Sequence, residues 1–228
     1  MTSERYIRNI GTISPEEHDK LRNSWVCVVG CGGLGGYVIE GLARLGVGHI
    51  TAVDGDVFQQ SNLNRQLLAT ERSLGRYKAL VAQERVRIVN PEISLHPLCY
   101  FLSEENAADI IAEEYHVAVD AMDNIAGRRV LEKACEGKAI PLIHGAIAGW
   151  CGQVSVIMPG SETFAQLYPK GPDRGIETIT GTPCFTPAVV GAIQAAETVK
   201  LLLERPGVLK NKLLTIDLLS HEYEIIDI

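Results

Sequence analysis

The stretch VVGCGGLGG (residues 28–36) decides the fold of this chain, because Gly30, Gly32 and Gly35 form a G-x-G-x-x-G arrangement within it. The stretch begins within an apolar run, WVCVVG, which predicts a buried strand. The apolar segment that follows the glycines predicts a helix. Glycines at such a turn let the backbone approach a phosphate closely, and the helix N-terminus favours the negative charge. The stretch therefore predicts a nucleotide-binding turn.

Strand-like and helix-like segments alternate on the C-terminal side of this turn. Predicted strands, in chain order, are WVCVVG, HITAVDGD, ISLHPL, HVAVDAMDN, IPLIHGA and GQVSVIM. Helices are predicted over Gly35–Gly46 and Gly75–Val89, and in AADIIAEEY, AGRRVLEKACEG and PAVVGAIQAAETVKLLLE. The tail KLLTIDLLSHEYEIIDI predicts two antiparallel strands around a turn. We expect an α/β fold with a Rossmann-like, doubly wound, mainly parallel sheet that continues into a mixed sheet with antiparallel C-terminal strands.

One domain of 228 residues accounts for this pattern. We expect an N-terminal arm and helix over 1–24, a nucleotide-binding half over 25–145, and a second half over 146–228. Within the second half, residues 159–183 contain four prolines and four glycines without apolar periodicity. They predict a long loop, and loops of that length are usually functional or disordered.

Composition excludes several functional classes. The net charge of −7 disfavours general nucleic-acid binding, and no apolar run approaches the length of a membrane span. The first twenty residues are too polar for a secretory signal peptide, so we expect a cytoplasmic protein. The six cysteines include no C-x-x-C pair, which disfavours a zinc framework or a disulfide scaffold.

Charged residues after the glycine turn favour a nucleoside triphosphate over a nicotinamide cofactor. Asp54 ends the second predicted strand, where its carboxylate could accept hydrogen bonds from ribose hydroxyls. Arg65 lies in SNLNRQ, and Lys78 lies in the next predicted helix. Two added cations fit a triphosphate, whose charge must be neutralised before attack at phosphorus. The alternative for Arg65 and Lys78 is a solvated charged surface.

A third polar group lies in VDAMDN. Asp123 and Asn124 come just after the fourth predicted strand, at the edge where open parallel sheets bind ligands. A carboxylate beside a triphosphate usually holds Mg²⁺, which prefers oxygen ligands. The alternative is that Asp123 is only the N-cap of the following helix.

These segments together resemble the ubiquitin-activating-enzyme-like adenylyltransferases. The motifs RYIRNI, GCGGLGG, VDGDVFQQSNLNRQ, LGRYKA, NP, DAMDN, HGAIAGWCGQV and PAVVGAIQAAETVKLLL occur in the order typical of that family. They are most similar to the bacterial and archaeal members that activate the sulfur carriers of molybdopterin and thiamine synthesis. The resemblance spans roughly Arg5 to Leu203.

The resemblance implies a reaction, its cofactors and its site. The C-terminal Gly-Gly carboxylate of a ubiquitin-like sulfur-carrier protein, bound by the half over 146–228, would attack the α-phosphate of Mg·ATP to give an acyl-adenylate and pyrophosphate. It also implies a homodimer, in which Arg8 enters the neighbouring subunit's site. The implied nucleotide-site residues are Gly30, Gly32, Gly33 and Gly35 as the cradle, Asp54 at the ribose, Asn62, Arg65 and Lys78 at the phosphates, and Asp123 at Mg²⁺ with Asn124 beside it.

The chain departs from the family pattern in its cysteines. Many members carry two C-x-x-C pairs that bind zinc, and their absence here predicts that this chain binds none. Some members use a cysteine to accept the activated carrier. Cys184, just before the last predicted helix, is the candidate nucleophile, and Cys151 is a weaker one. Enzymes that only adenylate need no such cysteine.

Three other functions compete with carrier adenylation. Relatives of the same fold adenylate a modified tRNA base or a peptide terminus, although the acidic charge makes tRNA less attractive. A nicotinamide oxidoreductase would use the glycine turn and Asp54 but leave Arg65, Lys78 and Asp123 without a role. An inactive scaffold would be expected to have lost its phosphate-binding residues, and this chain retains them.

Overall fold

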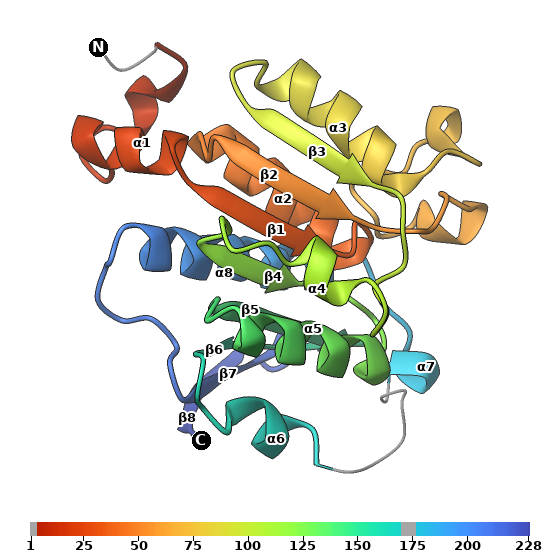
Figure 1. Cartoon of the computed structure of the whole chain (residues 1–228). Coiled ribbons are helices and arrows are strands. Elements are labelled where there is room, and N and C mark those ends of the chain that lie inside the picture. Colours follow the sequence, from red (N-terminus) through yellow and green to blue (C-terminus); the bar gives the residue numbers. More distant parts are fainter. Residues whose placement is uncertain (1–3, 170–176) are drawn as a thin grey trace.

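The computed structural model, which describes residues 4–169 and 177–228, is built around one eight-stranded sheet in the order β3-β2-β1-β4-β5-β6-β7-β8 (Figure 1). Strands β1 to β5 pair in parallel, while β6, β7 and β8 are antiparallel to their neighbours. The strands are β1 Trp25–Val29, β2 His49–Val53, β3 Ser94–Leu98, β4 Val117–Asp120, β5 Leu142–Ala148, β6 Cys151–Ile157, β7 Lys212–Asp217 and β8 Glu222–Asp227. The predicted fold class is confirmed, including the C-terminal hairpin.

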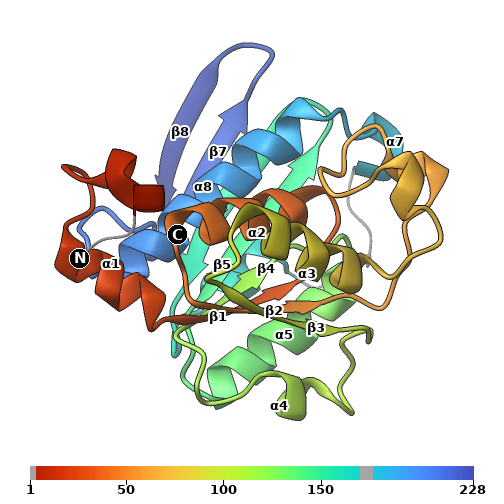
Figure 2. The same cartoon turned by 90° about the horizontal axis from the view of Figure 1, so that it is seen from above.

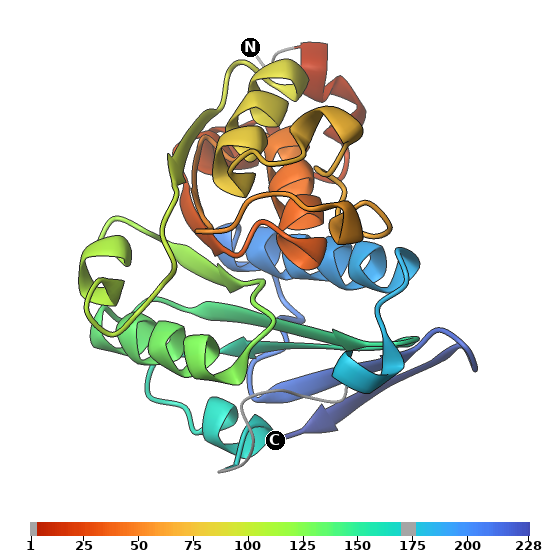
Figure 3. The same ribbon diagram turned by 90° about the vertical axis from the view of Figure 1, so that its right-hand side faces the viewer.

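Helices cover both faces of the parallel part of the sheet (Figure 3). Side chains of β1 alternate between two buried clusters, with Val26 and Val28 in one and Cys27 and Val29 in the other. The alternation follows from the two-residue repeat of a strand. Because both faces of β1 are buried, its sequence is apolar at every position. One face carries α2 Gly33–Leu45, α3 Lys78–Val89 and α8 Phe185–Leu202; the other carries α4 Ala107–Ile110, α5 Ile125–Gly137 and α6 Thr163–Leu167. Figure 2 shows α2 and α8 side by side over the sheet.

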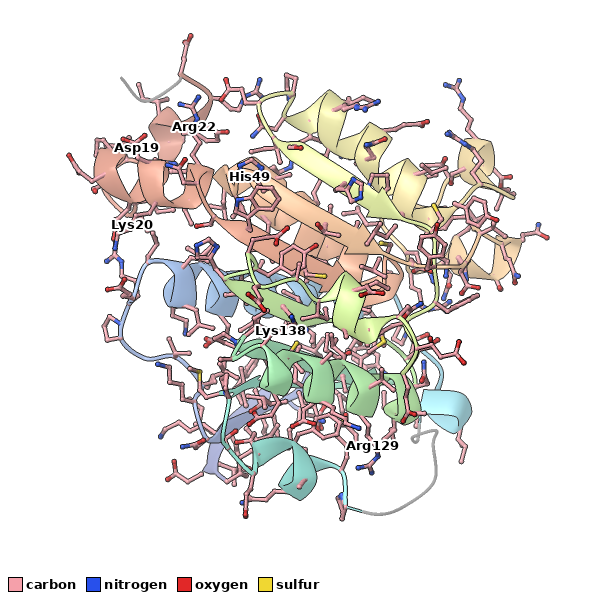
Figure 4. All side chains as sticks on the ribbon, in the orientation of Figure 1. Asp19, Lys20, Arg22, His49, Arg129 and Lys138 are labelled. Carbon is pink, nitrogen blue, oxygen red and sulfur yellow. The ribbon has the colours of Figure 1, made fainter. Side chains whose placement is uncertain are left out.

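The N-terminal segment packs at the end of the sheet opposite α7 (Glu177–Thr180), where Figure 4 labels Asp19, Lys20 and Arg22. It consists of a 3₁₀ helix, η1 (Glu4–Asn9), and α1 (Pro15–Arg22). Ser14 caps α1 by accepting a hydrogen bond from the Glu17 backbone, while Glu17 accepts one from the Ser14 backbone. This reciprocal capping, with proline at the first helical position, fixes where the helix begins.

Two predicted helices are shorter than their sequence patterns indicate. Helix α3 begins at Lys78 because backbone groups of the preceding residues, including Gly75 N–H and Arg76 C=O, pair with Phe58. Two short 3₁₀ helices, η2 (Gln60–Asn62) and η3 (Glu71–Ser73), precede it. Helix α4 ends at Ile110, and the Tyr115 hydroxyl then donates to Thr51 of β2. The later start of α3 arises from tertiary pairing, which local periodicity does not encode.

The prediction that residues 159–183 form one irregular loop is partly wrong, because this segment contains the short helices α6 and α7. Residues 170–176 of that loop lie outside the described residues. The predicted boundary between the two halves, 145/146, falls within β5, so both halves share one continuous sheet. None of the helices in the described parts of the chain is long and apolar enough to span a membrane.

Candidate functional site

A cavity of about 570 Å³ opens at the carboxyl ends of β1, β2 and β4. Val29, Val53 and Ala121, which end or follow these strands, form part of its wall. Eight of the residues predicted from sequence line it: Gly30, Gly32, Gly33, Asp54, Arg65, Lys78, Asp123 and Asn124. The cavity therefore lies at the edge where an open parallel sheet binds its ligand.

The glycine turn is held closely against β4. Gly30 has φ +97°, and a Cβ atom there would lie 2.5 Å from the Ala121 carbonyl oxygen, so only glycine fits. Gly32 precedes α2 without a side-chain cap, which leaves the first N–H groups of the helix available to an anion. Gly35 does not line the cavity, because a Cβ there would lie 1.8 Å from the Gly30 carbonyl oxygen. Gly35 therefore permits close packing of the turn, and its predicted contact with the nucleotide stays a prediction.

Asp54 joins the end of β2 to the glycine turn. Its carboxylate accepts hydrogen bonds from the backbone N–H of Cys31 (2.7 Å) and of Asp56 (2.8 Å). Burial raises the pKa of Asp54, while the charge of Lys78 and the two N–H donors lower it. The side chain is thus fixed at the cavity wall as a hydrogen-bond acceptor, as a ribose contact requires.

The two predicted cations line the same cavity in different settings. The Lys78 side chain is 8% exposed, and its Nζ lies 3.1 Å from Oδ2 of the more exposed Asp56. Arg65 donates to the Ser61 carbonyl (2.8 Å) and to Asn64 Oδ1 (2.9 Å), with no carboxylate paired to it among the described residues. Both positive charges therefore face a space that an anion can enter.

Asn62 does not join them. Its side-chain oxygen accepts a hydrogen bond from the Gln59 backbone N–H (2.9 Å), which caps η2, and it does not line the cavity. Asn62 thus supports the loop that carries Arg65, and its predicted phosphate contact stays a prediction.

Asp123 and Asn124 divide two roles that the sequence could not separate. Asn124 Oδ1 accepts a hydrogen bond from Gly127 N–H (2.7 Å) and is the N-cap of α5. The alternative that Asp123 is the cap is therefore wrong. Asp123 lines the cavity, and no hydrogen bond or ion pair to its carboxylate arises from the described residues.

The chemistry of Asp123 fits a magnesium ion carried by a nucleotide. Mg²⁺ usually takes one or two protein carboxylates and completes its shell with water and phosphate oxygens. Across residues 4–169 and 177–228 there is no group of three or more His, Cys, Asp or Glu side chains that could hold a metal without such help. The expectation that zinc is absent stays a prediction.

The cavity also contains residues that were not predicted from sequence. Gln66, 7% exposed, follows Arg65 and lies beside Gly32, and its position in SNLNRQ could have indicated it. Tyr100 and Phe101, 62% and 66% exposed, line the cavity beyond β3. Two adjacent aromatic residues just after a predicted strand were the sequence feature that could have indicated them. Arg128, on the first turns of α5, reaches the cavity wall through tertiary packing alone.

A second, groove-shaped cavity of about 410 Å³ lies over β5 to β8 and meets the first. We call it the sheet groove; its wall includes Cys151, Gln153, Tyr168, Asp217 and Glu222. The two cavities share four lining residues: Asp123, Arg128, Ala146 and Ile147. A chain lying in the sheet groove can therefore present its end to whatever occupies the nucleotide-type cavity.

Beneath this junction lies a buried polar pair from adjacent strands. Asp120 and His144 are both fully buried, and Asp120 Oδ2 lies 2.8 Å from His144 Nδ1. Burial lowers the pKa of His144, although the Asp120 carboxylate acts to raise it. Arg128 Nε approaches the same Asp120 oxygen at 3.4 Å. The sequence patterns predicted no role for Asp120 or His144.

Two predicted residues lie away from the cavity in a single chain. Arg8 is exposed on η1, which packs near the opposite end of the sheet, so a catalytic role for it requires a second copy of the chain. Cys184 is exposed immediately before α8 and does not line the cavity, although Thr182 does. Cys151 is exposed in the sheet groove. The predicted nucleophile and the predicted dimer stay predictions.

The sequence matches the model of the ThiF family over residues 6–228. The SAMP-activating enzyme E1 of Haloferax volcanii is 37% identical over 228 residues, covering 98% of this chain and 84% of that protein. The sulfur carrier protein adenylyltransferase of Thermus thermophilus is 36% identical over 231 residues, covering 96% of this chain and 85% of that protein.

A solved structure has the same fold. Escherichia coli MccB, crystallised with AMPCPP and MccA, superposes with a TM-score of 0.82 over 100% of this chain and 71% of that one. At 24% sequence identity the match concerns the arrangement of the sheet and helices.

Proposed function

The chain belongs to the ThiF family, and from that premise we propose that it is an ATP-dependent adenylyltransferase acting on a ubiquitin-like sulfur-carrier protein. The observation that carries the proposal is the shared wall of the two cavities, where Asp123 and Arg128 line both. A nucleotide in one cavity and a carrier tail in the other would meet at these residues. The two relatives named above as carrier-activating enzymes support the same activity.

ATP fits the first cavity residue by residue. The triphosphate would lie at the N-terminus of α2, between Arg65 and Lys78, where backbone N–H groups and two cations offset its charge. Asp54 would accept hydrogen bonds from the ribose hydroxyls. Tyr100 and Phe101 provide an aromatic surface for the adenine ring.

The carrier would enter through the sheet groove. The C-terminal residues of the carrier are glycines. Because glycine has no side chain, its backbone can approach the nucleotide closely. At the junction, a terminal carboxylate oxygen would attack the α-phosphorus of ATP. The bond from phosphorus to the bridging oxygen would break, pyrophosphate would leave, and the carrier would hold AMP as a mixed anhydride.

The protein's contribution to this step is positional and electrostatic. Two anions must be brought together, and fixed positive charge lowers the cost of their approach. Lys78 and Arg65 would face the charge that develops on the leaving pyrophosphate, and Arg128 would face the carboxylate. Asp123 would hold Mg²⁺, which neutralises phosphate charge when bound.

Two features extend this proposal beyond one chain and one step. Arg8 would enter the nucleotide cavity of the neighbouring subunit in a homodimer, since in its own chain it lies on η1 near the other end of the sheet. Cys184, exposed before α8, would attack the acyl-adenylate as a thiolate, so that a thioester to the carrier forms and AMP leaves. The proposed setting for these reactions is the cytoplasm.

Carrier-dependent exchange of labelled pyrophosphate into ATP tests the proposal. We expect exchange with a carrier ending in Gly-Gly and none with the same carrier shortened by its last glycine. Exchange driven by a modified tRNA or a peptide would point to the alternative substrates of this fold. Turnover of NAD without any exchange would contradict the proposal.

A further inference from the structure

The side chain of Tyr168 connects the sheet groove to the buried Asp120–His144 pair. Tyr168 directly follows α6 and lines the sheet groove. Its hydroxyl lies 3.1 Å from His144 Nε2 and 2.6 Å from Arg128 Nη1. One phenol oxygen thus joins a buried histidine to the arginine that lines both cavities.

The donors and acceptors in this group allow one consistent arrangement. Asp120 Oδ1 accepts from Met122 N–H (3.0 Å), and Oδ2 faces both His144 Nδ1 and Arg128 Nε, so Asp120 is an acceptor throughout. With the imidazole neutral, His144 Nδ1 therefore carries the proton and donates it, which leaves Nε2 as an acceptor. The Tyr168 hydroxyl then donates to Nε2, and its oxygen lone pairs face Arg128.

The contacts among Asp120, His144, Tyr168 and Arg128 form a closed ring, and each residue comes from a different segment of the chain. Asp120 from β4 orients His144 from β5, His144 orients the Tyr168 hydroxyl, and Tyr168 receives Arg128 from α5. Arg128 completes the ring at Asp120 and also donates to the Met122 carbonyl at 2.6 Å. The Tyr168 ring lies edge-on to His144, with 5.3 Å between centroids. An arginine side chain has several rotatable bonds, and this ring of contacts selects one orientation for it.

The backbone of Tyr168 is fixed as well. Arg129, labelled in Figure 4, donates from Nη2 to the Tyr168 carbonyl at 2.9 Å. Neighbouring arginines of α5 therefore hold Tyr168 by its hydroxyl and by its main chain. The Phe164 ring packs against the Tyr168 ring at 5.2 Å. These contacts fix the phenol at the groove wall independently of its hydroxyl, so the hydroxyl can be removed without freeing the ring.

We propose that Tyr168 and His144 are positioning residues for the adenylation step, and that they act by fixing the orientation of Arg128 at the junction where the carrier carboxylate meets the nucleotide. The inference rests on the proposed function, and it assigns that function two residues which contact neither phosphate nor Mg²⁺. We expect their effect in the attack step, because Arg128 is the residue that they orient and Tyr168 itself lines only the sheet groove.

Tyr168→Phe is the informative variant. The substitution keeps the ring and its packing, and Gln153 Nε2, 3.2 Å from His144 Nε2, still supplies that acceptor with a donor. Tyr115→Phe is the matched control, since it removes another buried hydroxyl, 2.9 Å from Thr51 Oγ1, outside both cavities. Tyr168→Phe removes a hydroxyl that contacts His144 and Arg128, Tyr115→Phe removes one that contacts Thr51, and only the first variant touches Arg128.

The test measures kcat and KM for a Gly-Gly carrier in pyrophosphate exchange, together with the Kd of ATP. We expect Tyr168→Phe to lower kcat by about 10-fold to 100-fold with the Kd of ATP unchanged, and Tyr115→Phe to leave kcat unchanged. His144→Asn should lower kcat similarly, and the double variant should be no worse than either single one. Equal kcat for the two phenylalanine variants, or additive losses in the double variant, would overturn the inference while leaving the proposed function intact.

A measurement without turnover separates this inference from the activity. Nitrogen NMR of the full-length protein at pH 7 should show His144 protonated at Nδ1 and unprotonated at Nε2. A proton on Nε2 would overturn the positioning role whether or not the protein exchanges pyrophosphate. Wild-type protein that gives no exchange with any carrier would instead refute the proposed function, and the role of Tyr168 would fall with it.

Discussion

The Asp54 carboxylate accepts a hydrogen bond from the backbone N–H of Cys31 at 2.7 Å, which ties the acidic end of β2 to the middle of the glycine turn. The same carboxylate accepts from Asp56 N–H at 2.8 Å. Asp54 therefore shapes the turn before any ligand arrives, and it remains at the cavity wall where a ribose would lie.

Replacing Asp54 by Ala should weaken both the fold and nucleotide binding. Two backbone N–H groups lose a charged acceptor, which costs about 1–3 kcal/mol of unfolding free energy. ATP affinity should fall at least tenfold, because the turn loosens and the ribose loses its acceptor. Urea denaturation and calorimetric titration measure the two effects. Wild-type affinity in Asp54→Ala would show that the ribose lies elsewhere.

Gly30 should tolerate no side chain. Gly30→Ala places a Cβ 2.5 Å from the Ala121 carbonyl oxygen at φ +97°, so we expect destabilisation of about 1–3 kcal/mol and loss of ATP binding. Gly137→Ala is the control, because nothing lies within 4 Å of its Cβ position at the end of α5. That substitution should leave thermal stability equal or slightly higher. Comparable losses in both variants would contradict the packing described for the turn.

Lys78 should act through its charge. Lys78→Met keeps the buried stem and removes the ammonium group, so we expect ATP affinity to fall about tenfold or more with thermal stability nearly unchanged. Asp56→Asn is the matched control, as it removes the partner 3.1 Å away and leaves Lys78 charged. ATP binding that survives in Lys78→Met as well as in Asp56→Asn would exclude Lys78 from the phosphate site.

Stability should fall in mild acid through His144. Burial lowers the pKa of this histidine in the folded protein, below its ordinary value of 6.5. Below pH 6.5 the unfolded chain therefore binds a proton that the folded chain does not, and the unfolding free energy decreases as pH falls. The slope for one proton is at most about 1.4 kcal/mol per pH unit.

His144→Asn isolates this contribution. His18 also has a pKa lowered by burial, so the wild-type slope contains more than one histidine. Denaturation midpoints measured from pH 7 down to pH 5 should decline less steeply in His144→Asn than in the wild type. Parallel curves for the two proteins would show that the pKa of His144 is the same in the folded and the unfolded chain.

The sequence predicted those features of the site that local geometry determines. The glycine turn, Asp54 at a strand end, and Asp123 beyond β4 all follow from strand–turn–helix units, whose carboxyl ends meet at one edge of the sheet. Motifs mark a turn without separating residues that touch a ligand from those that support the backbone, and the structure gives Gly35 and Asn62 backbone-supporting contacts.

Residues brought together by long-range packing were not predictable in the same way. Arg128, His144 and Tyr168 come from α5, β5 and the segment after α6, and their hydrogen bonds span up to 40 residues of sequence. Helix periodicity places Arg128 on α5 but does not say what its guanidinium contacts. Helix α3 likewise begins later than its pattern indicates, because the residues before it pair with Phe58.

Intact mass spectrometry of a Gly-Gly carrier incubated with this protein, Mg²⁺ and ATP tests the central claim most directly. The account predicts that the carrier gains the mass of AMP, that pyrophosphate is released in parallel, and that Asp123→Asn forms neither product although its fold is retained. Transfer of AMP to another substrate, with the carrier unmodified, would contradict the claim. Carrier adenylation undiminished in Asp123→Asn would contradict the site assigned to it.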